Sequence, residues 1–351
     1  AKIGVKMGNY PLLGRGDVNI YSLFVERSLK LINSFGMSGL LVPVGICTDI
    51  NAAPFFKYIA SSKRLSNILV FENTGGWLFE DVHHEDKPTV FISGGQERSF
   101  EEIDYSVFIR SLSELQDPSR RFPVKASGFA NVNPNTGTAA LFRDRASGQM
   151  VSKIYDRAPV LVNRSGEEPV EAWPVCYATM FHMTNDSDKF WTRDTLEAEG
   201  AYPIEHGHWK MAQRGWLPLY EGKSIDAFNH RYASVTTSTT GVSGQGVAHP
   251  SAADDLASPT FAPTPRYWVE ADDLEWPNPF DWSLSFRDTT NVNNERTAIF
   301  AIIPVCGAGN KIPLLKSKSK EASIFLCANG NCFLFDYVSR RKIQSRNINK
   351  Y

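Results

Sequence analysis

Two helical patterns and three short apolar runs alternate through the first hundred residues. Between Tyr21 and Leu31 apolar side chains recur at helical spacing with charged residues opposite, which predicts an amphipathic helix. A second helical pattern covers Phe55–Ser62. The apolar runs, which we interpret as buried strands of a parallel sheet, are Gly39–Val44, Ser66–Glu72 and Lys87–Ile92. This alternation predicts part of a doubly wound α/β sheet.

The remainder of the chain has a mixed pattern. Residues 117–138 are rich in Pro, Asn and Gly and predict loops, whereas Thr297–Pro304 predicts a strand and Ala322–Lys342 a helix. Residues 234–265 contain mostly Ser, Thr, Gly, Ala and Pro, which predicts a flexible segment. We therefore expect an α/β part at 1–115 and an α+β part at 116–351, with the flexible segment inside the second.

Composition is that of an ordinary globular protein, with 351 residues, 42% hydrophobic and 21% charged. No apolar run is long enough for a membrane span or a signal peptide, so we expect a cytoplasmic chain without membrane contact. The five cysteines are scattered without CxxC spacing, which argues against a disulfide framework or a zinc cage. Cys327 and Cys332 are therefore predicted to be free thiols in an apolar environment.

Positive charge is concentrated at the end of the chain. From Lys311 to Tyr351 there are nine Lys and Arg against two acidic residues, so this segment carries +7 and leaves −8 for the rest of a chain whose net charge is −1. Contact with phosphates requires such a basic segment. A solvated tail has the same composition, so the charge alone leaves both interpretations open.

Few residues have the spacing of catalytic or metal-binding sites. His83-His84 and His206-x-His208 lack a third ligand at suitable spacing, and we interpret them as surface or hydrogen-bonding histidines. We therefore expect no metal site and no catalytic residue in this chain.

Three polar clusters are better candidates for function. Gly14–Asn19 precedes the first helix and offers Asp17 or Asn19 as its N-cap. In Leu217–Tyr232 aromatic and basic side chains alternate, as stacking on bases and contact with phosphates require. Phe286–Lys311 is rich in Asn and Arg, the side chains that read base edges with two hydrogen bonds. Each cluster is also compatible with a structural ion-pair network, but together they favour a DNA surface.

At these residues the sequence resembles the large adenine-N6 DNA methyltransferases of restriction–modification systems, the type IIG-like group. The resemblance runs from about Tyr10 to the C-terminus, and its most specific blocks are "LPLYEGK" and "NERT". The matching blocks, in order, are Gly14–Glu26, Val42–Asp49, Phe71–Lys87, Phe181–Thr192, Leu217–Ala233, Pro265–Val269, Phe286–Leu315 and Phe335–Lys342.

The resemblance implies that the chain contains parts of two domains of a larger enzyme. Residues 1–115 would be the trailing half of a Rossmann-like methyltransferase sheet, and residues 116–351 the α+β target recognition domain. The glycine motif for S-adenosylmethionine and the Asn-Pro-Pro-aromatic motif are expected upstream of Ala1, since neither occurs here. Without them the chain has no means of methylating a flipped adenine, and its cofactor-binding residues stay unknown.

One departure from the family concerns the flipped base. Family members usually place a stacking aromatic after the Lys of the "VH---K" block. Here Pro88 follows Lys87 and the nearest aromatic is Phe91, which puts base stacking at that position in doubt.

Our leading hypothesis is sequence-specific binding of double-stranded DNA on behalf of such an enzyme, together with an upstream methyltransferase half or subunit that binds S-adenosylmethionine. Asp17 and Glu72 are candidates for shaping the catalytic cleft. The candidate DNA contacts are Lys223, His230, Arg231, Tyr232, Arg287, Asn293, Arg296, Asn310, Lys311, Arg340, Arg341 and Lys342, the last three on phosphates. The alternatives are a non-catalytic assembly subunit of a defence complex, and a standalone methyltransferase with an unrecognised cofactor site.

Overall fold

The chain folds into two compact units, Ala1–Ala172 and Trp173–Tyr351. The computed structural model describes residues 8–16, 18–82, 86–173, 175–237, 246–291, 294–317, 319–343 and 348. Within these residues no helix combines the length and hydrophobicity that crossing a bilayer requires.

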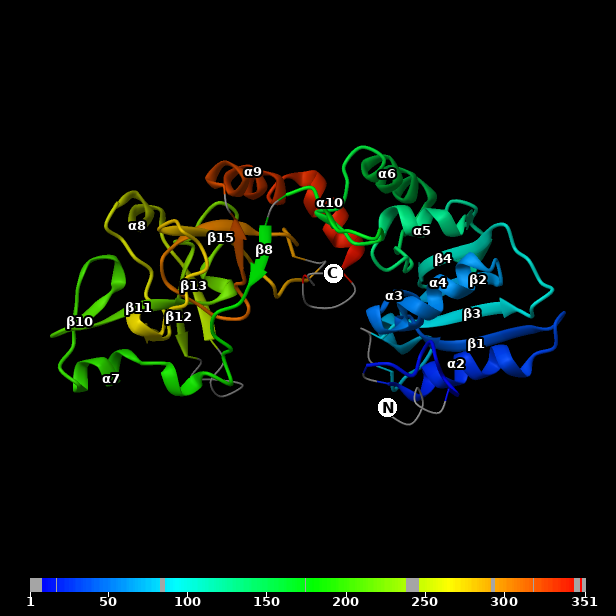
Figure 1. The fold of residues 1–351 in the computed structure, drawn as a ribbon, viewed down its shortest axis with the longest axis horizontal. Coiled ribbons are helices and arrows are strands. Elements are labelled where there is room, and N and C mark those ends of the chain that lie inside the picture. The colour runs from blue at the N-terminus through cyan, green and yellow to red at the C-terminus, as the bar shows by residue number, and fades with distance from the viewer. Residues whose placement is uncertain are drawn as a thin grey trace. The chain divides into compact units, whose positions relative to one another are not determined.

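The first unit is built on one five-stranded mixed sheet (Figure 1). Its strands are β1 (Met37–Pro43), β2 (Leu65–Phe71), β3 (Pro88–Gly94), β4 (Ile103–Ile109) and β5 (Arg121–Val124), in the spatial order β1-β3-β2-β4-β5. β2 and β4 are parallel, but β3 is antiparallel to both of its neighbours and β5 is antiparallel to β4. The expected all-parallel pairing is therefore wrong. β1 and β2 do run in the same direction, because each is antiparallel to the β3 strand between them.

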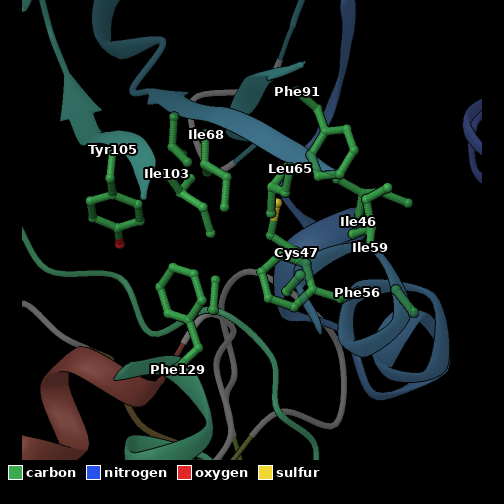
Figure 2. Close-up of a cluster of buried hydrophobic side chains, with 14 of the residues drawn as sticks. Ile46, Cys47, Phe56, Ile59, Leu65, Ile68, Phe91, Ile103, Tyr105 and Phe129 are labelled. Carbon is green, nitrogen blue, oxygen red and sulfur yellow. The ribbon is translucent and has the colours of Figure 1, made fainter. Parts of the chain in front are cut away.

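Helices pack on this sheet around a large cluster of buried apolar side chains, part of which is drawn in Figure 2. The helices are α2 (Ile20–Leu31), α3 (Gly45–Thr48), α4 (Ala53–Ser61), α5 (Ala126–Val132) and α6 (Arg145–Tyr155), with 3-10 turns at Ile50–Ala52, Thr74–Gly76 and Leu112–Gln116 and a short hairpin of β6 (Val162–Asn163) and β7 (Val170–Glu171). Phe56 and Ile59 of α4 face Ile68 and Phe91 of the sheet in the close-up. The predicted helices and strands of the first hundred residues are thus confirmed to within about two residues.

The unit boundary lies well beyond the expected 115/116, because the segment after it completes the first core. Phe129 of α5 packs against Tyr105, with ring centroids 6.0 Å apart. The Tyr105 hydroxyl donates to the carbonyl of Ala140 (2.6 Å) and accepts from the backbone N–H of Phe142 (3.1 Å). The residues predicted as a loop at 117–138 therefore contain β5 and α5 and belong to the α/β unit.

The described residues of the second unit form two larger sheets and a separate two-stranded hairpin. The strands of one sheet are β9 (Tyr202–Pro203), β10 (Trp209–Met211), β11 (Arg214–Tyr220), β14 (Trp268–Glu270) and β17 (Gly307–Ala308). Those of another are β8 (Val175–Ala178), β15 (Trp282–Phe286), β16 (Phe300–Pro304) and β18 (Leu314–Ser317). A separate hairpin joins β12 (Ala233–Thr237) to β13 (Gly246–Pro250).

Short helices complete the second unit. They are α7 (Arg193–Ala198), α8 (Ala253–Ala257), α9 (Lys320–Gly330) and α10 (Phe333–Lys342), with 3-10 turns at Ser187–Lys189, Glu205–Gly207, Gly222–Ser224 and Ala271–Asp273. The single helix predicted at Ala322–Lys342 is divided after Gly330. Cys332 is the N-cap of α10, and its Sγ accepts from the N–H of Phe335 at 3.4 Å. Because the helix is interrupted between Gly330 and Phe333, the side chains of α10 do not continue the 3.6-residue periodicity of α9.

The flexible segment predicted at 234–265 is ordered over its described residues. It contains the β12–β13 hairpin and α8. Backbone hydrogen bonds hold this segment, with the Ser251 N–H donating to the carbonyl of Tyr232 and the Val235 N–H to the carbonyl of Thr264. Residues 238–245 lie outside the described part of the chain.

Candidate nucleic-acid interface

The "LPLYEGK" block holds its charged side chains against neighbouring backbone. Lys223 donates to the carbonyl of Gly246 at 2.7 Å. The carboxylate of Glu221 lies 3.0 Å from the guanidinium of Arg266, and both side chains are buried. Arg231 crosses to the α8 region. Its guanidinium donates to three carbonyls, those of Leu256 (2.9 Å), Ser258 (2.7 Å) and Phe261 (3.3 Å). These cations stabilise the fold of their own loops.

Arg287 joins the "FRD" block to the same region. Its Nε donates to the carbonyl of Gly222 at 2.9 Å, and a second guanidinium nitrogen donates to the carbonyl of Ile225. Burial lowers the pKa of Arg287 relative to its ordinary value. A buried guanidinium with two carbonyl acceptors acts as a brace for the chain from Gly222 to Ile225.

Asp336 of α10 anchors the "NERT" block. Its carboxylate accepts the backbone N–H groups of Thr297 (2.7 Å) and Ala298 (2.9 Å) and pairs with Arg340 (2.7 Å). Burial by itself would raise the pKa of Asp336, but these N–H groups and the Arg340 guanidinium lower it overall. Arg340 also donates to the carbonyl of Glu295, so it bridges α10 and this block.

The other predicted DNA contacts have varied environments. Lys311 pairs with Asp288 at 2.9 Å, and Asn310 accepts from the Met183 N–H at 3.4 Å. The Arg341 guanidinium lies 3.3 Å from the centroid of the Tyr337 ring. Burial lowers the pKa of Lys342 to about 8.

His230 and Tyr232, which flank Arg231, are both half-buried. Burial and the neighbouring Arg231 lower the pKa of His230. Asn293 and Asp17 lie outside the described residues. DNA contact stays a prediction for His230, Tyr232 and Asn293, as does the role of Asp17 in shaping a catalytic cleft.

One predicted cation lies beside a strongly exposed aromatic ring, and a second exposed ring belongs to a turn that is hydrogen-bonded to the same region. Arg296 donates to the carbonyl of Asn331 at 2.7 Å, and its guanidinium lies 5.2 Å from the centroid of the Phe333 ring. Phe333 is 84% exposed and Phe228 is 63% exposed. We call Phe228, Arg296 and Phe333 the aromatic surface.

Buried Asn331 connects the members of the aromatic surface. Its side chain accepts from the Phe300 N–H (3.0 Å) and donates to the Phe300 carbonyl (2.8 Å). The same Phe300 carbonyl accepts the N–H of Phe228 at 3.0 Å. Arg296 is hydrogen-bonded to Asn331, and Phe333 is the second residue after Asn331. Asn331 and the Phe300 carbonyl therefore support all three residues of the aromatic surface.

Sequence reasoning placed Phe228 in a candidate block and named Arg296, but it missed Phe333. A continuous helix from Ala322 to Lys342 gives no reason for Phe333 to be exposed. The signal that could have identified it is Asn331-Cys332, a plausible C-cap followed by an N-cap.

The first unit has an exposed apolar surface of a different kind. Ile20, Phe24 and Leu31 of α2 are 70%, 67% and 69% exposed and lie on one side of the helix, opposite buried Val25. We call these three residues the α2 stripe. α2 lies alongside β1 (Figure 1), and within the described residues β1 pairs only with β3.

The expected cleft residues of the first unit are occupied by internal contacts. Glu72 pairs with Arg110 at 2.5 Å. Phe91 is buried in the core and cannot stack on a base. Asn19, the alternative cap of α2, does accept the N–H of Tyr21 at 3.4 Å.

Within the described residues no group of His, Cys, Asp and Glu has the arrangement of a metal site. The rings of His206 and His208 have centroids 6.3 Å apart, and burial followed by the charge of His206 lowers the pKa of His208. All five cysteines are free, with Cys327 buried and Cys332 half-buried.

No protein-family model and no curated protein matches the chain. Among solved structures, the chain is similar to the type IIG restriction endonuclease BpuSI, with a TM-score of 0.37 and 11% sequence identity over 99% of this chain. The chain spans 43% of the length of that protein. A TM-score and an identity this low do not show that the two proteins share a fold. The function of this chain is therefore inferred from its own residues.

Proposed function

We propose that this chain supplies sequence-specific binding of double-stranded DNA as the target recognition part of an adenine-N6 DNA methyltransferase or restriction–modification enzyme. The aromatic surface carries the proposal. Exposed rings can stack on bases, a contact that contributes about 1–3 kcal/mol per base in single strands, and in a duplex they act at a base step that they partly unstack. The Arg296 guanidinium beside Phe333 supplies positive charge at the same place for a phosphate or a base edge.

The blocks that carry the family resemblance also frame this surface. Arg287 of the "FRD" block braces the chain leading into Phe228, and Asp336 of the "FDYV" block holds the "NERT" block that contains Arg296. Residues far apart in the sequence thus cooperate in presenting Phe228 and Arg296. This supports interpreting the blocks as a binding module.

S-adenosylmethionine would be bound by a separate methyltransferase part. At the carboxyl end of β1, the backbone of Gly45 is closely covered by side chains, since a Cβ there would lie 2.4 Å from the Asp49 carboxylate and 2.9 Å from the Tyr21 hydroxyl. Glu72 is paired with Arg110. We therefore assign no step of methyl transfer to this chain.

The proposal is tested by titrating the full chain with duplex DNA and following fluorescence anisotropy at low and moderate salt. We expect binding that weakens steeply with salt. Replacing both Phe228 and Phe333 by Ala should weaken binding by at least about tenfold. Phe24→Ala removes an equally exposed ring from the other unit and should bind as wild type. Indifference of the wild-type chain to DNA at low salt would refute the proposal.

The α2 stripe favours a second candidate function, assembly with another protein. Three large apolar residues on one exposed helix side are unusual on a monomer and typical of protein contacts. In this reading the chain is a non-catalytic subunit of a defence complex. Co-purification with the proposed methyltransferase part, with and without Phe24→Glu, tests it. Loss of association in the variant, together with wild-type DNA binding, would assign α2 to assembly.

A further inference from the structure

Phe228 has an unusual backbone conformation for a bulky residue. Its φ is 60°, in the left-handed region that glycine adopts without strain and that aromatic residues rarely enter. The residue is nevertheless at the exposed tip of a turn. A glycine would satisfy the turn more easily, so the ring itself requires an explanation outside local folding.

The turn is held in place by several independent hydrogen bonds. Asp226 and Asn229 exchange two backbone hydrogen bonds of 2.8 Å each, which closes a two-residue loop of Ala227 and Phe228. The Asp226 side chain accepts the Ala227 N–H at 2.8 Å, and the Asn229 side chain accepts the Arg231 N–H at 2.9 Å. These bonds make the loop rigid on both sides of the ring.

Two further contacts fix the turn to the body of the second unit. The Phe228 N–H donates to the carbonyl of Phe300 in β16 at 3.0 Å. Arg287 donates to the carbonyl of Ile225, at the base of the turn. A strained residue persists only where surrounding contacts determine it in this way, and such residues occur at ligand-binding sites.

The surroundings of the ring indicate its ligand. Through Phe300 and Asn331, the turn shares its support with Arg296 and with Phe333. The carboxylate of Asp226 accepts the Ala227 N–H within the turn itself. An apolar ring on a hydrogen-bonded turn, with a guanidinium and a second exposed ring held by the same Phe300–Asn331 support, matches stacked bases and their phosphates better than a purely apolar protein surface.

We infer that Phe228 is a wedge that inserts at a base step of double-stranded DNA and partly unstacks it, while Arg296 and Phe333 contact the adjacent strand. Apolar side chains inserted in this way bend the duplex away from the wedge. The inference rests on the proposed function, because it specifies how the aromatic surface acts on DNA. A rigid turn suits this role, since a mobile loop would yield instead of separating the bases.

The test measures bending and binding separately on the same full-length chain. A short mixed-sequence duplex labelled at both ends reports bending by energy transfer, and anisotropy reports binding. Phe228→Ala is expected to lose most of the change in energy transfer while its affinity falls by about tenfold. Phe228→Leu keeps an apolar wedge and should retain most of the bending. Phe325→Ala, which removes a ring of 64% exposure from α9, is the matched control and should bend DNA as wild type.

A second readout uses duplexes with 2-aminopurine placed at successive positions. Unstacking raises 2-aminopurine fluorescence, and the rise should require Phe228 at the inserted step. Phe228→Gly relieves the backbone strain, so a folded Phe228→Gly chain that binds but does not bend DNA supports the wedge and excludes misfolding. Binding with bending unchanged in Phe228→Ala would overturn the inference and leave the proposed function standing. Absence of DNA binding by the wild-type chain would overturn both.

Discussion

The α2 stripe and the aromatic surface expose large apolar side chains to a similar degree but differ in what surrounds them. The stripe lies on a regular helix beside β1, an edge strand that contains no charged residue. The opposite edge, β5, is short and carries Arg121 and Pro123, which discourage further strand pairing. The aromatic surface instead has a strained turn and a guanidinium. Exposed apolar area alone therefore does not identify a partner, whereas the neighbouring hydrogen-bonding groups and charges do.

The largest expected effect tests whether the aromatic surface depends on its buried anchor. Asp336→Ala leaves the N–H groups of Thr297 and Ala298 without their acceptor and Arg340 without its ion pair. We expect a loss of about 3–5 kcal/mol in the free energy of unfolding of the second unit. Seven of the eight tryptophans lie in that unit, so denaturation followed by tryptophan fluorescence measures it. A denaturation midpoint equal to that of the wild-type chain would show that the second unit does not depend on the Asp336 carboxylate.

Asp336 also predicts a pH dependence. Its pKa is lowered in the folded chain, so the carboxylate contributes stability above its unfolded pKa of about 3.9, and this contribution is lost as pH falls through the folded value. The denaturation midpoint of the second unit should therefore fall in acid more steeply in wild type than in Asp336→Asn. Equal slopes would contradict this assignment.

A smaller effect is expected at the brace of the Phe228 turn. Arg287→Met removes hydrogen bonds to the carbonyls of Gly222 and Ile225 and should destabilise the second unit by about 2–3 kcal/mol. The matched control is Arg193→Met, which removes an exposed arginine whose Glu197 partner is 3.7 Å away and should change stability by less than about 0.5 kcal/mol. An equal loss of stability in the two variants would show that Arg287 contributes no more to the fold than an exposed arginine does.

The salt dependence of DNA binding separates the contributions of Arg296 and Phe228 within the aromatic surface. Arg296→Ala should reduce the slope of log affinity against log salt by about one, because one phosphate contact is lost. Phe228→Ala should weaken binding without changing that slope, since stacking releases no counterions. Titrations at several salt concentrations measure both quantities. An unchanged slope in Arg296→Ala would place the phosphate contacts elsewhere.

The smallest effects on folding and DNA binding are expected in the α2 stripe. Phe24→Glu combined with Leu31→Glu changes only exposed positions and should alter stability by less than about 0.5 kcal/mol. DNA affinity should also stay at the wild-type level, while co-purification with a protein partner is lost. A large change in DNA affinity would mean that the two surfaces do not have separate functions.

Local pattern predicted most helices and strands of the first hundred residues, but neither their arrangement nor the elements that complete the first unit after them. The helix at 21–31 and the strands near 40, 68 and 90 follow from periodicity and apolar runs, which are short-range properties. The direction in which strands pair is non-local, and buried antiparallel strands have the same apolar composition as parallel ones. The same limitation misplaced the unit boundary, since Tyr105 recruits Phe129 and the Ala140 carbonyl from later in the chain.

Sequence by itself determined which residue types gather into blocks and where the strongly periodic helices and apolar strands of the first hundred residues lie, because these depend on neighbours along the chain. Only the tertiary structure decided what each arginine does. Arg287 meets the Gly222 carbonyl 65 residues earlier, and Arg296 meets the Asn331 carbonyl 35 residues later. The first guanidinium is surrounded by protein and braces a turn, whereas the second lies beside an exposed ring. Burial distinguishes them, and burial is set by packing between segments that are distant in sequence.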